Sequence, residues 1–218
     1  MMRIKSISYC YFGPAFAIGR PTNALGSERG MVEFTVVGDD TKYYMKVDAD
    51  SRHEILNVKS WDYSELEELH INYVVHGKDT PVEIDVEHII KLPIKRLSLA
   101  GVTIKGQPRG AKIVGDKDCP KYVWDNVLMY LPTLQYLTLE DDGIIYSLDF
   151  TYNPDLKEVT LVCMDIRDIK GYDTQDNLGI RLIRCSLNED TAVALMKHSL
   201  SKMRQNKDDF TLELSTEL

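Results

Sequence analysis

From residue 60 onward, apolar residues recur at regular intervals along the chain. A six-residue template, apolar-x-x-apolar-x-apolar with mostly polar residues at x, occurs five times. The copies begin at Leu66, Ile94, Leu134, Leu156 and Ile180. The alternation at the end of the template is that of a β-strand with one buried face, so its fourth and sixth positions are predicted to point into a core. A further run, Phe210 to Leu214, keeps only the alternation.

The spacing of the copies indicates an internal repeat. Their first positions are separated by 28, 40, 22 and 24 residues, and prolines precede three of them at Pro93, Pro132 and Pro154. Proline cannot lie in a central strand ladder, so these residues indicate where the chain turns into a strand. Similar units at such a period are expected to stack with their strands parallel. An ordinary open α/β sheet is the alternative interpretation.

The segments between the copies are predicted to return along the back of the sheet. Glu87 to Leu92 and Tyr122 to Leu131 have helical spacing of apolar residues. Asn188 to Met203 is the clearest helix, with Asn188 or Asp190 as its cap. The stripe predicted to face the core of this helix consists of Ala192, Leu195, Met196, Ser199 and Met203.

The first 50 residues have a different pattern and are predicted to form strands. Val32 to Val36 and Tyr43 to Val47 flank Gly38 to Thr41, an arrangement typical of a hairpin. Gly13 to Gly30 is rich in glycine and is predicted to be a loop. Residues 1–52 are therefore predicted to form a β-rich cap, packed as one unit with residues 53–218.

The segment from about residue 60 to the C-terminus resembles the leucine-rich repeat family. The resemblance lies in the strand template alone, because the Asn or Cys that the family places after the last strand leucine is not consistently present, and the repeat lengths vary. It implies an α/β fold: an irregular leucine-rich-repeat-like solenoid with a curved parallel sheet over residues 53–218, preceded by an N-terminal β-hairpin cap. It also implies that the sheet face binds proteins or peptides.

In this geometry the third and fifth template positions, with the residue that follows each strand, form the outward face. Tyr and Arg are the residue types most often found as interface anchors, so Tyr136 beside Arg96 is the predicted centre of binding. A plain solvated sheet face is the alternative. The predicted partner-binding residues are Glu68, His70, Arg96, Ser98, Tyr136, Thr138, Glu140, Glu158, Thr160 and Arg184, with Asn72 and Ser186 in the same rows.

Composition and charge limit the classes of partner. The chain has 218 residues, a net charge of -8, 44% hydrophobic and 28% charged residues, as in an ordinary folded protein. The negative charge argues against nucleic-acid and acidic-membrane binding. No apolar run approaches the roughly 18–20 residues of a membrane-spanning helix. Four scattered cysteines and the lack of any N-x-Ser/Thr acceptor predict free thiols in the cytoplasm.

Few motifs indicate chemistry. Residues 101–119 combine glycines with Lys105, Arg109 and Lys112, which could hold an anion, but Gln107-Pro108 stands where a phosphate loop needs Lys and Ser/Thr. The acidic run that starts at Glu140 lacks the alternating spacing of a calcium loop. The histidines lack metal-ligand spacing, and no nucleophile motif accompanies them. No catalytic residue, metal or cofactor is therefore predicted.

These patterns predict a non-enzymatic protein–protein interaction module, such as an adaptor, an inhibitor or an assembly component. The alternative is a small-anion or nucleotide-binding protein or enzyme that uses the insertion at residues 101–119. Self-association through the C-terminal strand, Phe210 to Leu214, is a third possibility, because that strand would leave an open sheet edge.

Overall fold

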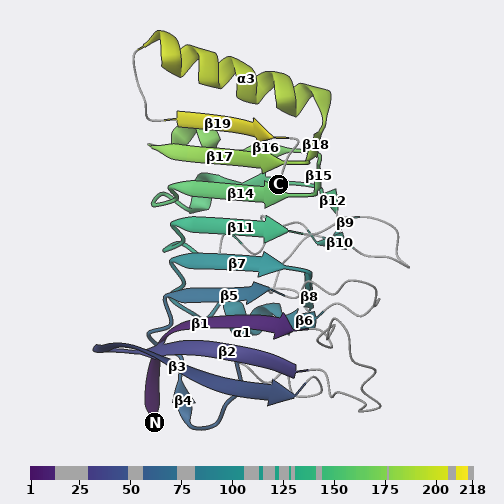
Figure 1. Ribbon diagram of the computed structural model, residues 1–218. Helices are drawn as coiled ribbons and strands as arrows, with labels where there is room; N and C mark the ends of the chain where they lie inside the picture. The colour runs from purple at the N-terminus through teal and green to yellow at the C-terminus, as the bar shows by residue number, and fades with distance from the viewer. Residues whose placement is uncertain are drawn as a thin grey trace, which may run out of the picture.

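The computed structural model of the chain is built around one large, mostly parallel β-sheet with few helices, an α/β arrangement (Figure 1). Ten strands form this sheet. The order β19-β17-β14-β11-β7-β5-β1-β2-β3 runs across it, and β4 pairs with β1 at the side. The structure describes residues 1–12, 29–48, 56–72, 82–105, 113–114, 121–122, 128, 131–140, 144–175, 177–205 and 210–215.

Six parallel strands make up most of the sheet. The first four copies of the sequence template lie side by side in register, so that Leu69, Leu97, Leu137 and Val159 form one row. The prediction of a mostly parallel sheet is confirmed. The six strands are β5 (Glu68–Asn72), β7 (Arg96–Ala100), β11 (Tyr136–Glu140), β14 (Glu158–Val162), β17 (Leu178–Ile183) and β19 (Phe210–Ser215).

The fifth copy was assigned in the wrong register. Ile180 lies opposite Val159, at the fourth template position, whereas the sequence prediction placed it at the first. Leu182 lies opposite Leu161, at the sixth. The reason is that Ile180, Leu182 and Ile183 are all apolar and allow two alternations, of which the structure uses the earlier one. Arg184 consequently lies beyond the end of β17 and outside the rows of the sheet face.

The N-terminal strands extend the same sheet. The predicted hairpin is confirmed, with its turn at residues 37–38. The first strand was not placed from the sequence: it pairs in parallel with β5 and antiparallel with β2, and so joins the hairpin to the repeats. These strands are β1 (Met2–Phe12), β2 (Arg29–Val36), β3 (Asp39–Asp48) and β4 (Trp61–Asp62).

Short strands form smaller sheets outside the large one. Most are parallel and follow a long strand at a constant offset: β12 (Ile144–Ile145), β15 (Asp165–Ile166) and β18 (Ser186–Leu187) pair in one set. The other sets are β13 (Leu148–Asp149) with β16 (Ile169–Lys170), β6 (Val82–Asp85) with β8 (Val102–Lys105), and β9 (Ile113–Val114) with β10 (Lys121–Tyr122). The helix predicted from Tyr122 is wrong at that residue, because Tyr122 pairs with Ile113 in an antiparallel ladder.

The helices are α1 (Val86–Ile89) and α3 (Glu189–Arg204), with 3-10 turns η2 (Phe150–Tyr152) and η3 (Tyr172–Thr174). The Asn188 cap is confirmed, since its side chain accepts a hydrogen bond from the Asp190 amide. Figure 1 shows α3 beside β19, at the end of the sheet. Within the described part of the chain, no helix is both long and apolar enough to cross a membrane.

The predicted core-facing stripe of α3 is wrong at two positions. Thr191 and Leu195 are the buried residues of the helix, and the Thr191 hydroxyl donates to the Arg167 carbonyl at 3.0 Å. Met196 and Met203 are 53% and 67% exposed. The helix packs through a narrow strip around Thr191 and Leu195, so the wider apolar face that a helical pattern suggests is turned outward.

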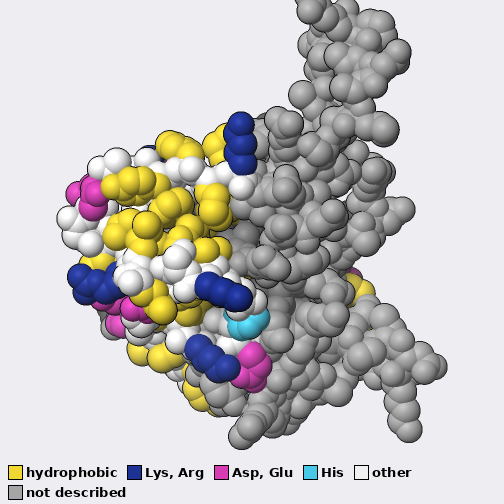
Figure 2. Space-filling model, turned by 90° about the horizontal axis from the view of Figure 1, so that it is seen from below, with side chains coloured by type: hydrophobic (Ala, Val, Ile, Leu, Met, Phe, Trp, Pro, Cys, Tyr) yellow, Lys and Arg dark blue, Asp and Glu magenta, His cyan; other side chains and the backbone are white. Residues whose placement is uncertain are grey.

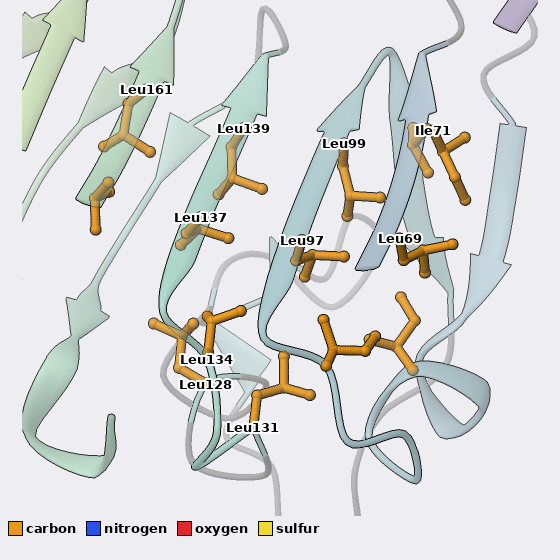
Figure 3. Packing of buried hydrophobic residues seen from close by; sticks show 14 of the residues in the cluster. Leu69, Ile71, Leu97, Leu99, Leu128, Leu131, Leu134, Leu137, Leu139 and Leu161 are labelled. Atoms are coloured by element: carbon orange, nitrogen blue, oxygen red, sulfur yellow. The ribbon is translucent and has the colours of Figure 1, made fainter. Parts of the chain in front are cut away.

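One apolar core lies beneath the parallel strands. Figure 3 shows Leu69, Leu97 and Leu137 on one side of the sheet, with Leu131 and Leu134 below them. All five are at most 1% exposed. Burying a leucine side chain contributes roughly 1.5–3 kcal/mol, so this aligned row is the main source of stability in the fold.

The same connections join successive repeats. Lys95, Gln135 and Lys157 each accept, on the backbone carbonyl, hydrogen bonds from the amides at the start of the next strand. A buried side chain adds to them: the Asn153 amide donates to the Leu128 and Leu131 carbonyls at 3.0 and 2.7 Å. Because the bonds recur at equivalent positions, each repeat fixes the position of the next.

The corner after the strands also recurs. Gly101, Cys163 and Arg184 each follow the last residue of a front strand, and their φ angles are 60°, 57° and 53°. The left-handed conformation disfavours residues with a Cβ, yet two of the three are not glycine. The shared corner therefore follows from the stacking of the repeats rather than from local preference.

Candidate functional site

The outward face of the large sheet, hereafter the front face, carries two straight rows of side chains. Parallel pairing in register aligns the residues of seven strands, from β1 to β19. Many of them are small, so the backbone of the sheet is accessible to an approaching chain. The rows are Ser6, Glu68, Arg96, Tyr136, Glu158, Gly179 and Thr211, and Ser8, His70, Ser98, Thr138, Thr160, Arg181 and Glu213.

The centre of the front face is an aromatic ring between two cations. The guanidinium carbon of Arg96 lies 4.0 Å from the centroid of the Tyr136 ring, and the Lys157 amine lies 5.9 Å from it. Such contacts hold the side chains in one arrangement before any ligand arrives. The Lys157 amine also lies 3.3 Å from the Gln135 side-chain oxygen. Among the described residues, no carboxylate pairs with Arg96.

A hollow of about 220 Å³ lies on the C-terminal side of this centre. Gly179 opens it, because a Cβ there would lie 3.0 Å from the Thr211 hydroxyl. Arg181 and Glu213 line its wall and form an ion pair at 2.7 Å. The hollow thus combines accessible backbone with both signs of charge.

A second hollow, of about 450 Å³, lies where β1 and β2 meet β5. Glu33 pairs with Lys42 at 2.8 Å, and the hydroxyls of Ser6 and Thr35 lie 2.6 Å apart. His70 lies on its rim, 3.8 Å from a Glu68 carboxylate oxygen.

The pKa of His70 is lowered from its usual value. Burial of the imidazole is the main cause, and the Arg96 charge adds to it, while Glu68 acts in the opposite direction. Since an unperturbed histidine titrates near 6.5, His70 is neutral at pH 7 and can both donate and accept a hydrogen bond.

The N-terminal end of the sheet has a different character. Figure 2 looks at the molecule from this end, and hydrophobic side chains gather there among Lys, Arg and acidic residues. Met31, Tyr43 and Tyr44 are 36%, 39% and 61% exposed. The charged residues Lys42 and Lys46 of the last strand, β3, work against pairing with a further strand.

The structure aligns nine of the ten predicted partner-binding residues on the front side of neighbouring strands. Glu140 ends β11, and Glu158 and Thr160 continue the rows on β14. Arg184 is the exception, because it follows β17 and its amide donates to the Ser215 carbonyl. The sequence prediction missed Arg181, Thr211 and Glu213. The signal for Arg181 was the Ile180-x-Leu182 alternation, 21 residues after the matching pair in β14.

The predicted anion-binding set is only partly visible. The backbone of Lys105 ends β8, whereas Arg109 and Lys112 lie outside the described residues. That prediction remains a prediction. Strand β19 is the last strand of the sheet, and self-association through it likewise stays a prediction.

The chemistry available to the described residues is that of binding groups. In the described ranges, no three His, Cys, Asp or Glu side chains cluster as metal ligands would. Cys163 and Cys185 are free thiols. Burial raises the pKa of the Cys185 thiol, whose sulfur lies 3.2 Å from the Leu161 carbonyl oxygen. That thiol therefore stays protonated at neutral pH, which disfavours it as a nucleophile.

Comparisons with known proteins identify no relative. No protein-family model matches the chain, and neither curated proteins nor solved structures give a significant match.

Proposed function

We propose that this chain is an irregular, leucine-rich-repeat-like solenoid and a non-enzymatic interaction module that binds another protein through its front face. The roles that fit are an adaptor, an inhibitor or a component of an assembly. Support for a solenoid comes from the in-register front strands, the recurring left-handed corners and the buried amide of Asn153. The free thiols Cys163 and Cys185 fit a cytoplasmic location.

The observation that carries the proposal is the Arg96–Tyr136 pair at the middle of the rows. Tyr136 presents a large carbon surface that loses little conformational freedom on binding, because Arg96 already holds the ring. Arg96 keeps donors available for a partner, since none of the described carboxylates pairs with it. An arginine and a tyrosine in the centre of a polar surface are the usual composition of an interface hot spot.

The face also defines the partner. A carboxylate or backbone carbonyl of the partner would accept hydrogen bonds from Arg96, and its carbon skeleton would cover Tyr136. Ser98, Thr138 and Thr160 are short, so an extended segment can approach the sheet closely across the strands. The two hollows on either side give such a segment room for larger side chains.

The test is affinity capture from the native source with quantitative mass spectrometry, using the full chain and matched variants. Tyr136→Ala and Arg96→Ala should each reduce recovery of the stoichiometric partner, by about tenfold or more in affinity, because hot-spot truncations cost at least about 2 kcal/mol. Tyr152→Ala is the matched control, since Tyr152 is 49% exposed but lies on η2, outside the front rows. Equal recovery by all three variants would reject the proposed face.

A further inference from the structure

Helix α3 exposes its apolar side chains instead of burying them. Val193, Met196, Leu200 and Met203 are 42%, 53%, 53% and 67% exposed. On the other side of the helix, Leu195 is fully buried, and His198 packs edge-on against the Tyr172 ring at 5.2 Å. The helix is therefore already attached to the fold by one side, and the exposed apolar stripe is an additional surface.

The exposed residues lie at the spacing of a helix–helix seam. The intervals between them are three, four and three residues, and at 100° per residue they fall within an 80° sector. This is the a/d pattern through which two helices interlock. Exposed apolar surface with this order is typical of an interaction site rather than of scattered surface residues.

The charges at the two ends of α3 indicate which helix fits there. Glu189 and Asp190 lie in the first turn, and Lys202 and Arg204 in the last. The ion pairs of the described residues include neither Glu189 nor Arg204. A second α3 in the opposite direction brings an acidic end against a basic end twice, whereas a parallel arrangement would bring like charges together.

We propose that α3 is a dimerisation helix, which pairs antiparallel with the α3 helix of a second copy of this chain. Val193 then lies opposite Met203 of the second copy, and Met196 lies opposite its Leu200. The contact is self-complementary, as a two-fold interface requires. Glu189 of each copy comes within about one helical turn of Arg204 of the other. The dimer does not depend on the front face, so it can stand or fall separately from the proposed function.

The strength of this dimer follows from its size. The helix has 16 residues, which gives a length of roughly 24 Å. A seam of that length lies at or below roughly 1,200 Å², the low end of specific interfaces. The expected result is a dimer in the micromolar range, in equilibrium with the monomer.

Sedimentation velocity of the full chain over roughly 1–300 µM tests the pairing. Wild-type protein should shift from monomer to dimer with increasing concentration. Leu200→Glu should raise the dissociation constant by at least about tenfold, since it places a charge in the seam. Ser201→Glu is the matched control, because it adds the same charge in the same turn on the side of the helix away from the stripe. Circular dichroism should show that both variants keep the wild-type fold.

Charge reversal distinguishes antiparallel pairing of two copies from any other association. Glu189→Lys should weaken the dimer about fivefold, because each of the two symmetric ion pairs contributes about 0.5 kcal/mol. Adding Arg204→Glu in the same chain should restore the wild-type dissociation constant to within about twofold. A wild-type monomer at every concentration would overturn the proposal. So would a dimer that Leu200→Glu leaves intact, or a charge reversal that the second substitution does not repair.

Discussion

Strand β11 and helix α3 both carry apolar side chains at regular spacing, but they place them on opposite sides. In β11, Leu137 and Leu139 are at most 2% exposed and point into the core between β7 and β14. In α3, Met196 and Leu200 are each 53% exposed.

The difference follows from position in the stack. An inner strand has neighbours on both sides and a core beneath it, whereas α3 lies at the end of the sheet and packs by one narrow strip (Figure 1). In repeat architectures each unit contacts only its neighbours, so a terminal unit always has one uncovered side. Inner units therefore determine stability, and the last unit is available for association.

The largest effect expected from this contrast concerns two leucines. Leu137→Ala should lower the free energy of unfolding by about 3 kcal/mol, because it leaves a cavity in a closely packed core. Leu200→Ala should change it by no more than about 0.5 kcal/mol, since the side chain is half exposed. Urea denaturation at a protein concentration well below dimerisation measures both. Equal losses would mean that α3 is part of the core.

A glycine comparison should give the next largest effect. Gly171 has φ 71°, and a Cβ there would lie 2.5 Å from the Thr151 amide nitrogen and 3.0 Å from an Asp149 carboxylate oxygen. Gly171→Ala should therefore cost roughly 2–4 kcal/mol, from backbone strain together with overpacking. Gly38→Ala in the hairpin has φ 82° but nothing within 4 Å, so it should cost only the strain. Thermal denaturation of the pair would separate the two contributions.

Two asparagines extend the same comparison to hydrogen bonds. Asn153→Ala should cost about 2 kcal/mol, because the Leu128 and Leu131 carbonyls inside the fold lose their donor. Asn188→Ala removes the cap of α3 and should cost about 1 kcal/mol. If the order of the two losses in chemical denaturation were reversed, the amide would not be a link between repeats.

The smallest expected effect lies on the front face and depends on pH. The pKa of His70 is lowered in the folded chain, so the unfolded chain binds more protons in the interval between the two pKa values. The contribution of His70 to stability should be constant above about pH 6.5 and decrease as the pH falls toward the folded pKa. His70→Gln should reduce the loss of stability between pH 7.5 and 5.5. An unchanged pH dependence would mean that the imidazole is freely solvated.

The sequence predicted the elements whose patterns allow one interpretation. Leu66 to Leu139 contain apolar positions that fit the template in one register, and those strands pair as expected. In β17, Ile183 and Cys185 offered a second alternation, and only pairing with Val159 decides between the two. That choice moved Arg184 off the front face and brought Arg181 onto it.

Two further features depended on tertiary contacts. The hydrogen-bonding partner of β1 is set by its neighbour β5, about 60 residues away along the chain, which no local pattern specifies. The apolar residues of α3 cover more than one side of the helix, and the pattern does not indicate which side meets the rest of the protein. The Arg96–Tyr136 contact, by contrast, was predictable, because both residues hold the third template position of strands that become neighbours.

The central claim is that the front face around Tyr136 is the surface that a protein partner covers. The most direct measurement is photo-crosslinking in extract of the native source, with a benzophenone amino acid placed at Thr138 on the front face or at Lys170 on β16. The account predicts one discrete adduct from position 138, which Arg96→Ala in the same chain abolishes, and no such adduct from position 170. An equal adduct from both positions, or one from position 170 alone, would contradict it.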